Sequence, residues 1–227
     1  MYNTCTFGGG RGMTQKAKVE WRLAPLRGKQ KKEAMRVLAR AFHADGMFTY
    51  VFPDESARAR HLPGVMRSGL SYGLKYGQVH VSAGEVEGVC VTALRGAPYG
   101  PVPRPSLAYR LGLTRLRTRL AYGKEAYIRY LLASAAVREL HVRNISGPHW
   151  YLLLLGVDPP RQGTGLGAAL LQQLLLRADG ERLPIYLDTF KKDNLTFYQK
   201  FGFEVKQELA VDRGLATVWA MVRPAKK

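Results

Sequence analysis

The stretch WYLLLLGVDPPRQGTGLGAAL, residues 150–170, decides the fold of this chain. It begins with an unbroken run of six apolar residues, which DPP at 158–160 ends soon afterwards. A short apolar run closed by a proline turn is typical of a β-strand that is buried on both faces. The loop QGTGLG at 162–167 then leads into leucines spaced three and four residues apart, which predict a helix. The stretch is therefore predicted to be a buried strand, a glycine-rich loop and a helix.

The junction between this loop and the helix suits a phosphate group. The first N–H groups of a helix have no partner within the helix, and the helix dipole adds about half a positive charge there. Glycines let a ligand approach the backbone closely and permit unusual backbone angles. The order of elements therefore predicts a binding site for a phosphate or a pyrophosphate.

The spacing of the glycines excludes two common nucleotide loops. A nucleoside-triphosphate loop ends in Gly-Lys-Ser/Thr, whereas here Gly167 is followed by Ala168 and Ala169. The dinucleotide pattern G-x-G-x-x-G is also absent, because Gly163, Gly165 and Gly167 occupy alternate positions. Taken alone, such a loop is also compatible with a tight turn between a strand and a helix.

The composition of the whole chain sets broad limits. With 227 residues, 46% of them hydrophobic, the chain can form one sizeable domain or two small ones. The net charge of +18 fits a protein that handles polyanions, either coenzyme phosphates or nucleic acid, although it also serves solubility. Two cysteines make no disulfide framework, which favours a cytoplasmic protein. No apolar run approaches the roughly 18 residues of a membrane span.

The order of strand and helix patterns predicts one α/β domain with no internal repeat. We expect a disordered leader at 1–16 and a domain at 17–227, with a mixed central sheet of about six to seven strands flanked by helices. A basic helical insert is expected at about 95–146. The aromatic-rich segment 45–54 is expected either to plug the core or to line a pocket, and the pocket wall is favoured because Gly46 and Pro53 break any regular element there. The G-x-S-x-G match at 69–73 follows no strand, so it is interpreted as part of a helix rather than as a nucleophile elbow.

Two motifs together resemble a known family. VDPPRQGTGLG at 157–167 resembles the acyl-coenzyme A loop of the GNAT N-acetyltransferases, Val-Asp-Pro followed by Gln-x-x-Gly-x-Gly. YLDTFKKDNLTFYQKFGFEV at 186–205 contains Asn-x-x-Phe-Tyr-x-x-Phe-Gly-Phe, which resembles the closing motif of the same family. The segments at 41–54 and 149–159 also resemble its small-molecule branch, which includes puromycin N-acetyltransferase.

The resemblance implies where acetyl-CoA, the acyl donor, would lie. In the family it occupies a V-shaped opening where two parallel strands splay apart. The backbone around Gly156 would meet the pantetheine, the glycine loop would hold the pyrophosphate, and a residue of the following helix would contact the coenzyme. The implied coenzyme-binding residues are Leu155, Gly156, Val157, Gln162, Gly163, Thr164, Gly165, Leu166, Gly167, Ala168 and Asn194.

The chemistry of acyl transfer suggests roles for three further residues. Tyr198 matches the family tyrosine that protonates the departing thiolate, and a phenol is a suitable donor because a free thiol has a pKa near 8.5. A strand N–H near Val157 can hydrogen-bond the thioester oxygen. Asp188 and His149 are the candidates for the base that takes a proton from the amine, although many relatives place Glu where this chain has Asp188. Each residue also has a structural alternative. His149 is then an ordinary residue at the edge of a strand, Asp188 the partner of a nearby arginine, and Tyr198 a buried residue with a satisfied hydroxyl.

These observations predict an acetyl-CoA-dependent N-acetyltransferase that acts on an amine, with a small molecule as the first acceptor class. The alternatives are a protein or peptide acceptor and a basic nucleic-acid-binding protein that retains the fold. Nucleic acid is disfavoured because basic residues mixed with tyrosines, as at 107–142, more often form a solvated face. No metal is expected, since the histidines show no ligand spacing and Cys-x-x-Cys is missing. The sequence does not choose between a monomer and a homodimer.

Overall fold

The computed structural model describes residues 21–96 and 113–226. The predicted leader at 1–16 and most of the proline-rich start of the predicted insert lie outside these residues. Among the described residues, no helix is both long and apolar enough to cross a membrane.

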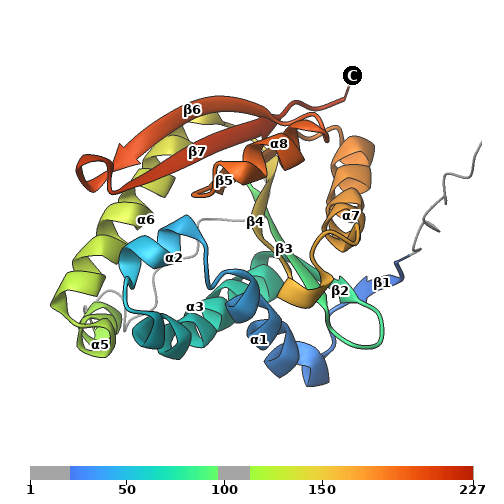
Figure 1. Ribbon diagram of the computed structural model, residues 1–227. Helices are drawn as coiled ribbons and strands as arrows, with labels where there is room; N and C mark the ends of the chain where they lie inside the picture. The colour runs from blue at the N-terminus through green and yellow to red at the C-terminus, as the bar shows by residue number, and fades with distance from the viewer. Residues whose placement is uncertain (1–20, 97–112, 227) are drawn as a thin grey trace, which may run out of the picture.

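A seven-stranded mixed sheet runs through the molecule in the order β1-β2-β3-β4-β5-β7-β6 (Figure 1). Among the strands of the described residues, only the central pair, β4 and β5, is parallel, and the other neighbours are antiparallel. This confirms the predicted α/β class and the mixed sheet of about six to seven strands. The strands are β1 (Leu23–Pro25), β2 (Gly77–Ser82), β3 (Gly88–Arg95), β4 (His149–Val157), β5 (Ile185–Thr189), β6 (Glu204–Val211) and β7 (Ala216–Arg223).

Helices cover both faces of the sheet. On one face α7 and α8 pack over its centre; on the other, α1 and α3 cover β2 to β4, while α2 and α6 cover β5 to β7 (Figure 1). Three clusters of buried side chains fill the spaces between these layers. The helices are α1 (Lys31–Ala41), α2 (Gly46–Val51), α3 (Glu55–Tyr76), α5 (Leu113–Tyr122), α6 (Lys124–Asn144), α7 (Leu166–Glu181) and α8 (Asp193–Gln199).

The parallel strands β4 and β5 pair only where they begin. Over their described lengths the register joins Trp150 to Ile185 and Tyr151 to Tyr186, and no later residues pair. The C-terminal halves of the two strands instead line a cavity, as described below. The predicted V-shaped splay is therefore present at the middle of the sheet.

A β-bulge in β4 determines which backbone groups point into the splay. The register with β3 shifts between Val91 and Thr92, so that Leu153 is the extra residue on β4. Beyond the bulge, the N–H of Asp158 donates to the carbonyl of Glu87 at 2.8 Å, on the β3 side. Because N–H directions alternate along a strand, the N–H groups of Leu155 and Val157 point the other way, into the splay.

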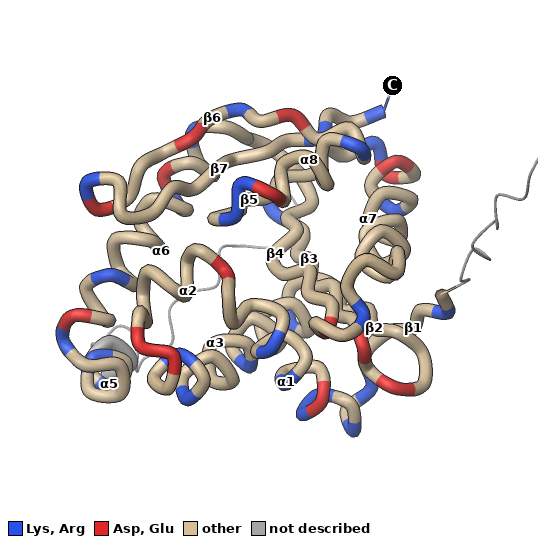
Figure 2. Tube along the Cα trace, viewed as in Figure 1, with Lys and Arg blue, Asp and Glu red and all other residues tan. Residues whose placement is uncertain are grey.

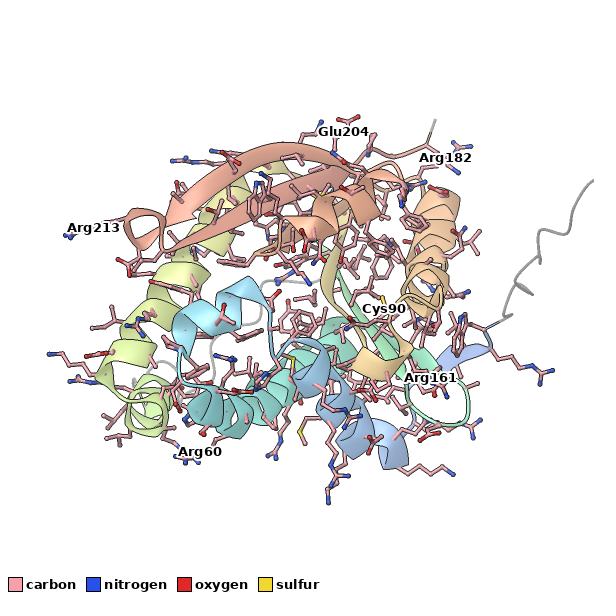
Figure 3. All side chains as sticks on the ribbon, viewed as in Figure 1. Arg60, Cys90, Arg161, Arg182, Glu204 and Arg213 are labelled. Carbon is pink, nitrogen blue, oxygen red and sulfur yellow. The ribbon has the colours of Figure 1, made fainter. Side chains whose placement is uncertain are left out.

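The packing of α7 on the sheet confirms the helix that the leucine spacing predicts. Its inner side chains, among them Leu170 and Leu174, are buried against β3 and β4 together with Cys90 (Figure 3). Burial raises the pKa of the Cys90 thiol to about 12, so this cysteine is a protonated core residue.

The G-x-S-x-G match lies inside α3, as its sequence context predicts. Gly69 and Gly73 point at the sheet, where a Cβ atom would collide with the side chains of Leu154 and Val91. Ser71, between them, is exposed. The glycines therefore allow the helix to approach the sheet closely, and the motif has a packing role.

Candidate active site

A cleft of about 830 Å³, here called the main cleft, opens where β4 and β5 part. The end of β4, the glycine loop, the start of α7, α8 and the segment after α1 surround it. The structure thus brings together residues that the sequence places in three separate segments. The predicted site residues in its lining are Leu155, Gly156, Val157, Gln162, Gly163, Gly165, Gly167, Ala168, Asn194 and Tyr198.

The glycine loop has a backbone conformation that suits an anion. Gly163 and Gly165 adopt φ values of 77° and 89°, the left-handed region that glycine tolerates without strain. The first hydrogen bond of α7 runs from the Ala169 N–H to the Gly165 carbonyl at 3.0 Å. The three preceding N–H groups have no acceptor within the helix. Such groups, at the positive end of the helix dipole, are able to bind a phosphate.

Two residues predicted to bind the coenzyme are absent from the described lining of the main cleft. The Thr164 hydroxyl donates to the carbonyl of Arg161 at 2.6 Å, so it shapes the loop. The side chain of Leu166 is fully buried in the core beneath α7. Coenzyme binding by these two residues therefore stays a prediction for their backbone groups, because neither side chain faces the main cleft.

Cations that the sequence analysis missed also line the main cleft. Arg40 pairs with both carboxylate oxygens of Asp158, at 2.7 and 2.9 Å. Arg161, which is labelled in Figure 3, pairs with Glu87 at 2.6 Å. Lys191 and Lys200 have no ion-pair partner within the described part of the chain. Basic residues lie close to the start of α8 in Figure 2. The two lysines are therefore available to a phosphate.

A smaller cavity of about 100 Å³, here called the side chamber, shares part of its lining with the main cleft. It lies in the splay itself, between β4, β5 and the start of α2. Most of its walls are apolar, and Asp45 and Asp188 are its two acidic residues. Asp45, Met47 and Phe48 belong to its lining, so the predicted pocket wall is confirmed for the start of the segment 45–54, whereas Tyr50, Val51 and Phe52 fill the core. The residues shared by the two cavities are Phe42, Asp45, Leu155, Asn194 and Tyr198.

Tyr198, on α8, lies at the junction of the two cavities. It is only 8% exposed, and its hydroxyl has no hydrogen-bond partner among the described residues. Burial, with the neighbouring Cys90 and the carboxyl groups of Asp45 and Asp188, raises the pKa of this phenol. Tyr198 therefore remains protonated at neutral pH and can donate a proton into the site.

Asp188, on β5, lines the side chamber and accepts a hydrogen bond from the Tyr151 hydroxyl. Burial raises the pKa of Asp188 to about 6, the hydrogen bond from Tyr151 opposes that rise, and Asp45 adds to it. The group is mainly a carboxylate at neutral pH, yet its pKa is close enough to neutrality for it to accept a proton.

His149 lies on β4, which flanks the opening, but it does not belong to the described lining of either cavity. His149 is the first of the nine residues of β4, so the length of the strand, roughly 26 Å, separates it from Val157. Its Nδ1 lies 2.8 Å from the carbonyl of Gly147, and its Nε2 lies 2.8 Å from Nε2 of His141. It is a buried structural residue, and only Asp188 of the two base candidates reaches the site.

Comparisons with known proteins agree with this geometry. The chain matches the acetyltransferase (GNAT) domain over residues 126–205. An uncharacterised N-acetyltransferase of Schizosaccharomyces pombe is 31% identical over 106 residues, which are 46% of this chain and 43% of the relative. The match therefore spans less than half the length of that curated relative.

Two solved structures share the fold. A structure described as histone acetyltransferase HPA2 and related acetyltransferase, from Corynebacterium glutamicum, has a TM-score of 0.64 and 22% identity, covering 90% of this chain and 96% of its own. A mosquito arylalkylamine N-acetyltransferase like 5b has a TM-score of 0.63 and 20% identity, covering 89% and 99%. The residues that match the family model, 126–205, contain β4, the glycine loop, α7, β5 and α8, so this part of the chain is identified as a GNAT acetyltransferase domain.

Proposed function

We propose that the protein is an N-acetyltransferase that uses acetyl-CoA to acetylate the amine of a small molecule. The single observation that supports this proposal most is the position of Tyr198, a protonated phenol at the junction of a cleft of about 830 Å³ and a chamber of about 100 Å³. The cleft suits a coenzyme and the chamber suits an acceptor.

The main cleft fits coenzyme A on three grounds. The free N–H groups at the start of α7 suit a diphosphate, and the open backbone at Gly163 and Gly165 leaves room for it, because a Cβ atom there would meet no protein atom within 4 Å. Lys191 and Lys200 add positive charge. The N–H groups of Leu155 and Val157 point into the splay, where they can bind an extended pantetheine.

The residues around the junction can assist acyl transfer from a thioester, the activated group that acetyl-CoA supplies. Asp188 can accept a proton from the amine that enters the side chamber. An N–H of β4 that points into the splay can stabilise charge on the carbonyl oxygen. Tyr198 can donate its proton to the departing sulfur. These roles need no covalent intermediate on the protein.

The size of the side chamber favours a small acceptor over a protein chain. Its volume of about 100 Å³ equals roughly that of three water molecules in the liquid. An amino group with a short substituent fits such a space, whereas an extended peptide needs a longer groove. The arylalkylamine acetyltransferase with the same fold agrees with this choice of acceptor class.

Replacement of Tyr198 by Phe tests the proposal. We expect CoA release with a panel of small amines to fall about 100-fold or more, because the proton donor is lost. Acetyl-CoA affinity, measured by calorimetry, should change by less than about twofold, since little else is removed. Tyr186→Phe is the matched control, because the Tyr186 hydroxyl is also buried, has no partner among the described residues and does not belong to the described lining of either cavity.

Two results would contradict the proposal. Wild-type protein that binds acetyl-CoA but turns over none of the amines is not a small-amine acetyltransferase. Full activity of Tyr198→Phe would instead remove the phenol from the mechanism and leave water or another group as the acid.

A further inference from the structure

The side chamber contains a second carboxylate that the roles above do not use. Asp45 comes from the connection between α1 and α2, whereas Asp188 comes from β5. Both belong to the lining of the chamber, and the charge of Asp45 contributes to the raised pKa of Asp188. The other chamber walls are mainly apolar: Phe42, Met47, Phe48, Leu152, Leu153, Leu154, Leu155 and Phe190.

The structural role of Asp45 accounts for a hydrogen bond to one of its carboxylate oxygens, but it does not require a negative charge. Asp45 is the N-cap of α2, and its Oδ1 accepts a hydrogen bond from the Met47 N–H at 3.0 Å. A neutral asparagine or serine would cap the helix equally well. Burial of a carboxylate beside another acid costs free energy unless a cation compensates it. No lysine or arginine forms an ion pair with Asp45 in the described residues. Lys191 lowers the pKa of Asp45, but this effect is smaller than those of burial and of the hydrogen bond from Met47.

Tyr198 gives an independent indication that a ligand belongs here. More than nine-tenths of this side chain is buried, and it lines the same chamber. Its hydroxyl has no hydrogen-bond partner within the described chain. A polar group without a partner on a side chain this buried indicates a site for a polar ligand, and here it lines the chamber that contains both carboxylates.

We propose that Asp45 is an acceptor-binding residue, which together with Asp188 binds the acceptor as an ammonium ion that bears a small apolar substituent. This inference rests on the proposed function and narrows the acceptor class to small primary amines without a carboxylate group. The ammonium compensates the two negative charges, and the apolar walls contact the substituent. An amino acid would bring a third negative charge to the same place and is excluded.

The division of roles keeps the proton count balanced. The bound ammonium gives one proton to Asp188, and the neutral amine then forms the N–C bond while the C–S bond breaks. The sulfur receives a proton from Tyr198, which regains one from the acylated nitrogen. Of the two protons that the nitrogen loses, one reaches the thiol and the other leaves to solvent from Asp188. Asp45 takes part in none of these transfers, so its effect is on binding.

Three small probes test the class of acceptor. n-Butylamine is the cation, 1-butanol is its neutral counterpart, and norvaline carries the additional carboxylate. Their binding is measured by ligand-observed NMR and, for the amines, by steady-state turnover with acetyl-CoA. We expect wild-type protein to bind n-butylamine at least about tenfold more tightly than either of the other probes, as charge-assisted hydrogen bonds imply.

Asp45→Asn tests the residue, because asparagine keeps the N-cap of α2 and removes the charge. We expect the KM and the dissociation constant of n-butylamine to rise at least about tenfold, with a smaller change in kcat and unchanged affinity for acetyl-CoA. Asp54→Asn is the matched control. Asp54 is the N-cap of α3, where it accepts from the Ala57 N–H at 2.7 Å, but it is exposed and lies outside the described lining of both cavities.

The outcomes separate this inference from the proposed function. If n-butylamine binds no better than 1-butanol, or if Asp45→Asn binds n-butylamine as tightly as wild type does, the inference is wrong even when turnover is normal. If n-butylamine binds in an Asp45-dependent manner but no amine is acetylated, the chamber is a cation-binding site as inferred, and the proposed acetyltransferase activity is wrong.

Discussion

At the scale of single residues, the hydrogen bond from Tyr151 to Asp188 sets the protonation of the proposed base. Tyr151 is held by aromatic contacts, with ring centroids 4.8 Å from His141 and 5.4 Å from Tyr186. Its hydroxyl donates to the Asp188 carboxylate, which lowers the pKa of that group against the larger effect of burial. Tyr151 is thus a positioning residue that acts through Asp188.

Tyr151→Phe should therefore shift the pH dependence of the reaction. Without the donor, the pKa of Asp188 rises above its present value of about 6. The base is active as a carboxylate, so the acidic limb of the kcat/KM profile should move upward by about one pH unit. We expect a much smaller change on the plateau at higher pH. The measurement is kcat/KM for a small amine across the acidic and neutral range.

A profile whose acidic limb stays in place in Tyr151→Phe would show that Asp188 is not the base. A uniform loss at every pH would indicate a purely structural tyrosine. Tyr186→Phe again serves as the control and should leave the limb unchanged, since its hydroxyl donates no hydrogen bond to Asp188.

Sequence reasoning reached some of these residues and missed others for physical reasons. Tyr198 and Asp188 stand in a recognisable motif, and the structure places both at the side chamber. Asp45 and Tyr151 have no such motif, because their importance comes from neighbours that are distant in sequence. His149 was a base candidate because its strand flanks the opening, but the strand alone does not tell at which end a residue lies, and His149 lies at the end where β4 and β5 still pair.

At the scale of elements, the glycine loop and the start of α7 act as one unit. Gly165 is the N-cap of α7 in the left-handed conformation, at φ 89°. A residue with a side chain is strained by about 1 kcal/mol or more in that conformation. Its Cβ atom would also extend into the space that we assign to the diphosphate.

Gly165→Val should abolish acetyl-CoA binding in calorimetry, because strain and steric conflict act at the same position. Gly180→Ala is a control in the same helix. Gly180 has ordinary helical angles, and a Cβ atom there would meet no protein atom within 4 Å. Alanine at this position should raise the melting temperature slightly and leave acetyl-CoA affinity unchanged. Normal coenzyme binding by a folded Gly165→Val would show that the diphosphate lies elsewhere.

The elements themselves were predictable in proportion to their length. The run of six apolar residues and the leucine spacing predicted β4 and α7, and both are confirmed. The six-residue helix α2 was expected only as an aromatic connection, since fewer than two turns show no clear periodicity. The bulge at Leu153 leaves no signal in a run of identical apolar residues, yet it sets which N–H groups point into the splay.

At the scale of the whole molecule, the family resemblance predicted one α/β domain with a splayed central pair, and the structure confirms that fold. Local patterns could not give the strand order. The chain places β7 between β5 and β6, so its last strand lies inside the sheet rather than at its edge. Such an order depends on the burial of β7 by helices on both faces. The basic helical insert and the exact domain limits stay predictions.

One buried ion pair joins this last strand to the helix of the coenzyme site. Arg223, at the end of β7, is 7% exposed and donates to both carboxylate oxygens of Asp179 on α7, at 2.6 and 3.0 Å. It also donates to the carbonyl of Phe201 at 3.1 Å, after α8. Asp179 is more exposed than Arg223 and has a second partner in Lys226, at 2.8 Å. The two members of the pair therefore differ in what their loss leaves behind.

Asp179→Asn should destabilise the protein more than Arg223→Leu does. The first change leaves a buried guanidinium without its counter-charge, at a cost of about 3 kcal/mol, whereas the second leaves a partly exposed carboxylate that Lys226 still pairs. Urea unfolding measures both. Because Arg223 lowers the pKa of Asp179, the contribution of the pair is present above the unfolded pKa of the carboxyl group and is lost as the pH falls through the folded pKa. The difference in stability between wild type and Asp179→Asn should therefore shrink in acid. Equal losses in the two variants would contradict the predicted asymmetry, and a difference that does not change with pH would mean that the charge of Asp179 does not stabilise the junction of β7 and α7.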